Sequence, residues 1–169
     1  ARAAYPTACG PRGERPVSVD VLNECGYAVD ELELVACARH VMDRMKVHPD
    51  ADVAISLVDE AAMTVLHEKW MDLPGPTDVM SFPMDELRPG REGVDPVEGV
   101  LGDIVLCPSV AERQAREAGH APIEELLLLT THGLLHLLGF DHAEPEEKQE
   151  MFELQRQLLL TFLAGRGRR

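Results

Sequence analysis

The sequence predicts a single α+β domain, with a small mixed four-stranded sheet packed against about five helices. Three observations lead to this class. The chain has 169 residues, about the length of one domain. It contains four short stretches with the apolar pattern of strands and five longer stretches with apolar residues at helical spacing. The helical stretches are gathered mainly after the strands, which favours an α+β arrangement.

The first half of the chain alternates between predicted strands and helices. Asp30 and Asp59 stand where the two helices begin, and an aspartate side chain can accept hydrogen bonds from the free amides of a first helical turn. Apolar residues then recur at helical spacing in both helices, and Trp70 belongs to the apolar side of the second. The predicted elements are a strand over 17–22, a helix over 30–46, a strand over 53–58 and a helix over 59–70.

The second half contains the other two strands and three helices that each open with a proline. Proline suits the first turn of a helix because the amide hydrogen that it lacks is not used there. Residues 85–99 are rich in proline, glycine and charge, and predict a mobile loop. The last helix is expected to bury Met151 and Phe152. The predicted elements are a loop over 71–77, strands over 78–82 and 101–107, and helices that begin at Pro108, Pro122 and Pro145.

The ends of the chain differ in composition from the domain, which is expected to span residues 17–163. Residues 1–16 are rich in arginine, proline and glycine and predict a flexible N-terminal extension or expression remnant. Residues 164–169 predict a flexible tail. No apolar stretch reaches about 18 residues, so no membrane-spanning helix and no membrane partner are expected. The lack of a signal peptide favours a cytoplasmic protein, and a monomer is the favoured state.

The charge of the chain is strongly negative. It has 16 basic and 30 acidic residues, a formal charge of −14. Without residues 1–16 and 164–169, 10 basic and 29 acidic residues remain, a charge of −19. This charge works against nonspecific binding of a polyanion such as RNA. The four cysteines form no Cys-x-x-Cys pair and are expected to be buried free thiols, with Cys9 in the N-terminal extension.

Residues 132–142, His-Gly-Leu-Leu-His-Leu-Leu-Gly-Phe-Asp-His, carry the strongest functional signal. His132 and His136 are four residues apart on a leucine-rich helix, so their rings lie on one helix face. Gly139 can end the helix in a left-handed conformation, and the turn can bring His142 back toward the first two histidines. Three histidines without cysteine are the ligands of a catalytic zinc with its fourth position open to water. Imidazole also accepts nickel or copper, and a buried histidine cluster satisfied by Asp141 is the non-metal alternative.

Three segments of the chain resemble the YbeY family of bacterial endoribonucleases. The first is the histidine segment itself. The others are Pro76-Thr-Asp-Val-Met-Ser-Phe-Pro83 and Leu101-Gly-Asp-Ile-Val-Leu106, in matching order and spacing. The resemblance covers about residues 17–163. It implies one zinc ion held by His132, His136 and His142, and a cytoplasmic enzyme that processes the 3′ end of 16S ribosomal RNA and acts in ribosome quality control.

The chain departs from the family pattern at one position. Many relatives carry an arginine directly after the aromatic residue that precedes the Pro-Thr-Asp segment, and here Met71 follows Trp70. An arginine there is a natural phosphate contact, so the cation that binds substrate is left open. Lys69, Arg88 and Arg91 are the nearest basic residues in the sequence, and each is more often a solvated surface charge.

Two aspartates are the candidates for the catalytic and supporting roles around the metal. Asp141 can orient an imidazole or make local turn hydrogen bonds, and Asp103 can face the site or a solvated face of its strand. Lys69, Thr77 and Ser81 are the candidate substrate-binding residues, with ordinary turn and strand chemistry as the alternative.

The sequence leaves three functions open. The first is a zinc-dependent, single-strand-specific endoribonuclease with ribosomal RNA precursor and the small ribosomal subunit as partners. The second is a zinc peptidase, against which Gly133 stands where His-Glu-x-x-His peptidases carry glutamate. The third is a metal-stabilised, non-enzymatic ribosome-assembly factor, which the acidic domain favours because ribosomal proteins are basic.

Overall fold

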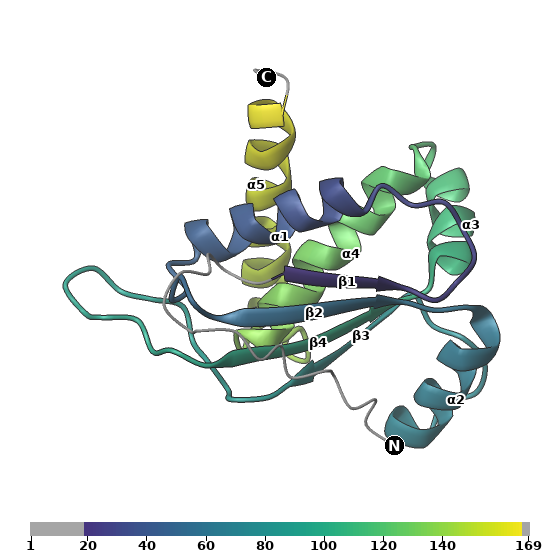
Figure 1. Cartoon of the computed structure of the whole chain (residues 1–169), viewed down its shortest axis with the longest axis horizontal. Helices are drawn as coiled ribbons and strands as arrows, with labels where there is room; N and C mark the ends of the chain where they lie inside the picture. The colour runs from purple at the N-terminus through teal and green to yellow at the C-terminus, as the bar shows by residue number, and fades with distance from the viewer. Residues whose placement is uncertain (1–18, 167–169) are drawn as a thin grey trace.

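The computed structural model of the protein describes residues 19–166, and the predicted extension over residues 1–16 lies outside the described residues. Four strands and five helices form one α+β domain, as the sequence predicts (Figure 1). In chain order the elements are β1 (Val19–Asn23), α1 (Glu31–Arg44), β2 (Asp52–Leu57), α2 (Glu60–Met71), β3 (Val79–Pro83), β4 (Val100–Leu106), α3 (Pro108–Ala118), α4 (Pro122–Leu137) and α5 (Pro145–Arg166).

The sheet is mixed and has the strand order β1-β2-β4-β3. The pairs β1–β2 and β2–β4 are parallel, and β3 pairs with β4 in the antiparallel direction. In the β3–β4 pair, Ser81 lies opposite Ile104 and Phe82 lies opposite Asp103. Because successive side chains of a strand point to opposite faces, Ser81 and Ile104 share one face, and Phe82 and Asp103 share the other.

Helices cover the two faces of the sheet unequally. In Figure 1, α1, α4 and α5 lie on one side and α2 lies on the other. Helix α4 is central, because it contacts α1, α3, α5, β3 and β4. Its leucines, including the fully buried Leu127, Leu134 and Leu135, join the main core. On the opposite face, Met63 of α2 packs with Met80 and Val105 in a smaller cluster.

Gly102 in β4 allows α4 to lie close to the sheet. The register of β4 against β2 shifts between Asp52 and Val53, and Gly102 has φ +142°. A Cβ atom at Gly102 would lie 2.3 Å from the carbonyl oxygen of Phe82 and 3.0 Å from Cδ2 of Leu137. Both distances are shorter than van der Waals contact, so glycine is required for this approach of helix and strand.

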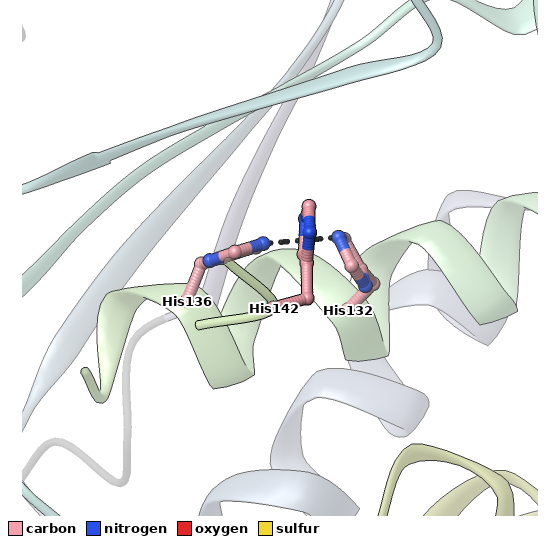
Figure 2. Close-up of side chains that lie close together, drawn as sticks. All are labelled: His132, His136 and His142. Carbon is pink, nitrogen blue, oxygen red and sulfur yellow. Dashed lines mark hydrogen bonds between the residues drawn. The ribbon is translucent and has the colours of Figure 1, made fainter. Parts of the chain in front are cut away.

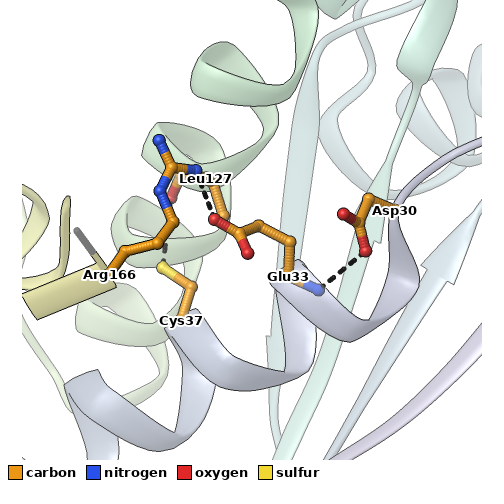
Figure 3. A network of polar contacts seen from close by, with 5 residues as sticks. All are labelled: Asp30, Glu33, Cys37, Leu127 and Arg166. Carbon is orange, nitrogen blue, oxygen red and sulfur yellow. Dashed lines mark hydrogen bonds and ion pairs between the residues drawn. The ribbon is translucent and has the colours of Figure 1, made fainter. Parts of the chain in front are cut away.

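The helix starts match the sequence prediction closely. The Asp30 carboxylate accepts from the Glu33 amide at 3.1 Å, and the Asp59 carboxylate accepts from the Ala62 amide at 2.8 Å. Helix α5 runs through Arg166, so the first three residues of the predicted tail are helical. Arg166 pairs with Glu33, and Cys37 on the same face of α1 donates to the Leu127 carbonyl (Figure 3). The first contact ties the last turn of α5 to α1, and the second ties α1 to α4.

The structure corrects three local expectations. Trp70, predicted on the apolar side of its helix, is 58% exposed, because α2 packs on the sheet mainly through Met63. Phe152, predicted to be buried, is 39% exposed. The start of the 85–99 segment, predicted to be mobile, is anchored: Leu87 is buried in the core, and the Gly90 amide donates to the Met45 carbonyl at 3.0 Å.

Two further expectations concern the thiols and the membrane. Cys25, Cys37 and Cys107 are free, as predicted. Cys37 and Cys107 are buried, as predicted, whereas Cys25 is only half-buried because it lies in the loop after β1; Cys9 lies outside the described residues. In the part of the chain that the structure describes, no helix combines the length and apolar character needed to cross a bilayer.

Candidate metal centre

Three histidine rings meet on one side of α4 (Figure 2). His132 and His136 project from successive turns of the helix, and His142 comes from the loop between α4 and α5. One ligand nitrogen from each ring lies within 4.8 Å of the other two. The Nε2 atoms of His132 and His136 are 3.0 Å apart. Two nitrogens bound to one tetrahedral zinc at 2.0–2.1 Å stand about 3.3 Å apart, so small ring rotations suit this pair to one ion.

Gly139 forms the turn that brings in the third histidine. Its φ is +96°, in the left-handed region that favours glycine. The Gly139 amide donates to the His136 carbonyl and the Phe140 amide donates to the Leu135 carbonyl, both at 3.0 Å. These bonds satisfy the last carbonyls of α4 and reverse the chain, so His142 returns to the helix face that carries the other two rings.

Gln155 of α5 fixes the orientation of His132. Its side chain is 9% exposed, and its Oε1 lies 2.7 Å from Nδ1 of His132. Since an amide oxygen only accepts, Nδ1 carries the proton and the Nε2 lone pair faces His136. A metal-binding histidine is commonly held in this way by a hydrogen bond to its other ring nitrogen.

The surroundings favour neutral imidazoles, which is the form that binds metal. Burial, and after it the neighbouring His132 and His142, together lower the pKa of His136 to about 4. Burial is also the main cause that lowers the pKa of His132, opposed by the hydrogen bond that His132 donates to Gln155 and by the charge of Asp78. The donor set, the ring spacing and the lowered pKa values of His132 and His136 all fit a divalent transition metal such as zinc.

Gly133 lies where α4 approaches the sheet. A Cβ atom at Gly133 would be 3.1 Å from Cγ2 of Ile104 and 3.1 Å from Oγ of Ser81. Ser81 donates to the Gly133 carbonyl at 3.2 Å. This face of α4 therefore packs tightly on β3 and β4, and the position has no room for the long carboxylate that a His-Glu-x-x-His peptidase needs.

Three of the five other predicted site residues lie at or near the triad, but each has a structural partner. Asp141 accepts a hydrogen bond from the backbone amide of His142 at 2.7 Å, and its charge raises the pKa of His136. Ser81 is held at the contact between β3 and α4. Thr77 donates to Asp78 at 3.3 Å, and Asp78 is close enough to act on the pKa of His132.

The structure does not bring the other two predicted residues to the triad. Asp103 is on the sheet face of Phe82 and Val105, opposite the face on which α4 packs. Lys69 lies 5.2 Å from the centre of the Trp70 ring, near the C-terminus of α2, on the side of the sheet away from α4.

Sequence reasoning missed two residues that α5 brings to the triad. Gln155 holds His132, and the Phe152 ring stacks at 6.1 Å on both His132 and His142. The spacing of Phe152 and Gln155, three residues apart after a predicted metal motif, was the available signal, because it places both on one helix face.

The fold and the site together define a small α+β protein with three histidines that could hold a metal ion at the end of a buried helix. The model of a family described as "Endoribonuclease YbeY" matches residues 21–163. Relatives with this description include proteins from Beutenbergia cavernae, 66% identical over 89% of this chain and 100% of the relative, and from Acidothermus cellulolyticus, 59% identical over 89% and 94%. A solution structure from Thermotoga maritima is similar, with a TM-score of 0.59 and 29% identity over 87% of this chain and 90% of the other. The chain belongs to the YbeY family.

Proposed function

We propose that the protein is a zinc-dependent endoribonuclease that cleaves single-stranded RNA. The observation that carries the proposal is the convergence of His132, His136 and His142 in a chain whose relatives are described as endoribonucleases. We further propose that it acts in the cytoplasm on the 3′ end of 16S ribosomal RNA and in ribosome quality control, with the small ribosomal subunit as its partner and as a monomer.

The residues of the chain hold the reacting groups in place. Bound zinc supplies an activated water and a Lewis acid for a phosphoryl oxygen. His132, His136 and His142 would hold the ion as neutral ligands, so the ion would keep its full positive charge for the anionic substrate. Gln155 keeps the Nε2 lone pair of His132 directed at His136, and Asp141 fixes the backbone of His142. Asp141 and Asp78 are the carboxylates that remain as candidates to accept a proton near the site.

The first test separates metal-dependent cleavage from a contaminating nuclease. We expect His136→Ala to lose both zinc and cleavage of single-stranded RNA, because two imidazoles hold the ion far more weakly than three. His48→Ala is the matched control, since His48 only accepts a local hydrogen bond from the Asp50 amide. Full cleavage by zinc-free His136→Ala would refute the proposal.

The peptidase function has less support. The packing of Gly133 against Ile104 and Ser81 excludes the glutamate of that class. Incubation of the zinc-loaded protein with casein tests it, and zinc-dependent peptide cleavage that His136→Ala abolishes would replace the RNA function.

The charge of the chain favours a role in the context of the ribosome. A formal charge of −14 repels free RNA but suits contact with basic ribosomal proteins. We expect the protein to sediment with small subunits at low salt, with or without zinc. If cleavage fails while this binding persists, the protein is an assembly factor and not an enzyme.

A further inference from the structure

Two carboxylates act on the three histidines. Asp78 acts on the pKa of His132, and Asp141 acts on that of His136. The position after Trp70, Met71, carries no charge. A site that binds an RNA strand in these surroundings needs cations placed next to the triad, because phosphate contacts supply most of the affinity for nucleic acid.

Arg88 lies against the turn of the metal centre. A Cβ atom at Gly139 would lie 2.9 Å from Cζ of Arg88 and 3.0 Å from its Nε and Nη1. Gly139 stands midway in sequence between His136 and His142. Because it has no side chain, it leaves the space that the Arg88 guanidinium occupies. The side chain is oriented by hydrogen bonds from Nη1 to the carbonyls of Glu86, at 3.1 Å, and Leu87, at 3.3 Å.

The backbone that carries Arg88 is fixed. Leu87, next to it, is 5% exposed and belongs to the main core. The Gly90 amide donates to the Met45 carbonyl, and the Asp85 carboxylate accepts from the Val100 amide at 2.7 Å. A cation on an anchored segment loses less conformational freedom on binding than one on a mobile loop.

Lys148 approaches the same site from α5. Its Nζ lies 5.7 Å from the centre of the Phe152 ring, and that ring stacks on both His132 and His142. The aromatic ring therefore links the ammonium group to the triad on the α5 side, whereas Arg88 lies at the Gly139 turn.

Neither cation is neutralised by a carboxylate. Within residues 19–166, Lys46, Arg113, Arg116 and Arg166 pair with glutamates. No carboxylate within residues 19–166 lies within 4.0 Å of the charged groups of Arg88 or Lys148. Both groups thus combine free charge with contact to the surroundings of the triad.

We propose that Arg88 and Lys148 bind the phosphates that flank the reacting phosphodiester, so that an RNA strand crosses the metal centre between them. The proposal rests on the endoribonuclease function and names the groups that hold its substrate. It predicts a phosphate-binding pair, called the grip below, formed by Arg88 before β4 and Lys148 in the last helix.

The test measures binding without cleavage. A fluorescein-labelled single-stranded RNA is titrated into the chelator-treated full chain, at several salt concentrations. We expect Arg88→Gln and Lys148→Gln each to weaken binding about tenfold, since each substitution removes one charge-assisted contact to a phosphate. Each should also make the negative slope of log Kobs against log salt shallower by about 0.7. Arg91→Gln is the matched control, because it removes the same charge from the same segment, three residues along.

The outcomes separate this proposal from the one on which it rests. If both variants bind with the affinity and salt slope of Arg91→Gln while the zinc-loaded protein cleaves RNA, the grip is refuted and the endoribonuclease function stands. If RNA binding weakens as expected but the zinc-loaded wild type does not cleave, the grip stands and the function fails. Arg88→Lys is the control for a folding defect in Arg88→Gln. Because lysine keeps the positive charge, this variant should show the wild-type slope of log Kobs against log salt.

Discussion

Replacing Gln155 with leucine tests how the metal centre is built. The Gln155 side chain is 9% exposed, so water does not readily take its place, and leucine has a similar volume. The variant removes the 2.7 Å hydrogen bond to His132 and leaves the Nδ1 proton of that ring without an acceptor. A buried donor without a partner costs about 1–3 kcal/mol.

This loss should appear mainly as weaker zinc binding. Without Gln155, the His132 ring can rotate or take the other tautomer, in which Nε2 carries the proton and cannot bind metal. Loss of such a supporting hydrogen bond typically lowers metal affinity 10–100-fold, or about 1.4–2.7 kcal/mol. The affinity is measured at neutral pH by competition with a chromophoric zinc chelator.

Two control variants make the test specific. Gln155→Glu keeps an oxygen acceptor and should bind zinc at least as tightly as the wild type. Gln157→Leu makes the same substitution at an exposed position of α5 and should leave the affinity unchanged. If Gln155→Leu binds zinc within about twofold of the wild type, the hydrogen bond does not position His132 and the reasoning fails.

Three further predictions concern packing, protonation and thiol reactivity. In Gly133→Ala, the added Cβ lies 3.1 Å from Ile104, so the overpacking cost of about 1–3 kcal/mol should exceed the helix-propensity gain of about 1 kcal/mol. Urea denaturation should therefore show a lower free energy of unfolding than that of the wild type. A more stable variant would contradict this. The pKa of His136 is lowered from 6.5 to about 4 in the folded protein. Between pH 4 and pH 6.5 the unfolded chain therefore binds more protons than the folded protein. The free energy of unfolding of the zinc-free protein should therefore fall as pH drops from 6.5 to 4, and fall less in His136→Asn; equal slopes would count against the lowered pKa. Burial raises the pKa of Cys37 to about 11, so iodoacetamide at neutral pH should modify the half-buried Cys25 much faster, as read by peptide mass spectrometry. Similar rates at the two thiols would show that α1 opens readily.

Helix starts and the histidine cluster were predictable because their signals are local. Asp30 and Asp59 bond to amides three residues ahead, so the cap and the helix that it starts lie in one short stretch of sequence. His132 and His136 share a helix face because they are four residues apart, and this holds whatever the helix packs against. Gly139 ends the helix through its own backbone conformation.

Residues whose roles depend on distant partners were not predictable in this way. Asp103 stands in a strand that the sequence identified, but the side to which it points depends on how β3 and α4 pack around β4. Gln155 and Phe152 looked like ordinary residues of an amphipathic helix until α5 was placed beside the triad.

By itself, the sequence determined the elements, the cluster of three histidines and the family, since each of these is encoded in short-range spacing. Only the tertiary structure decided which groups surround those histidines. Gln155 is 23 residues from His132, and Arg88 is 51 residues from Gly139. Contacts over such separations depend on the strand order β1-β2-β4-β3 and on the packing of α4 and α5, and no local pattern specifies these.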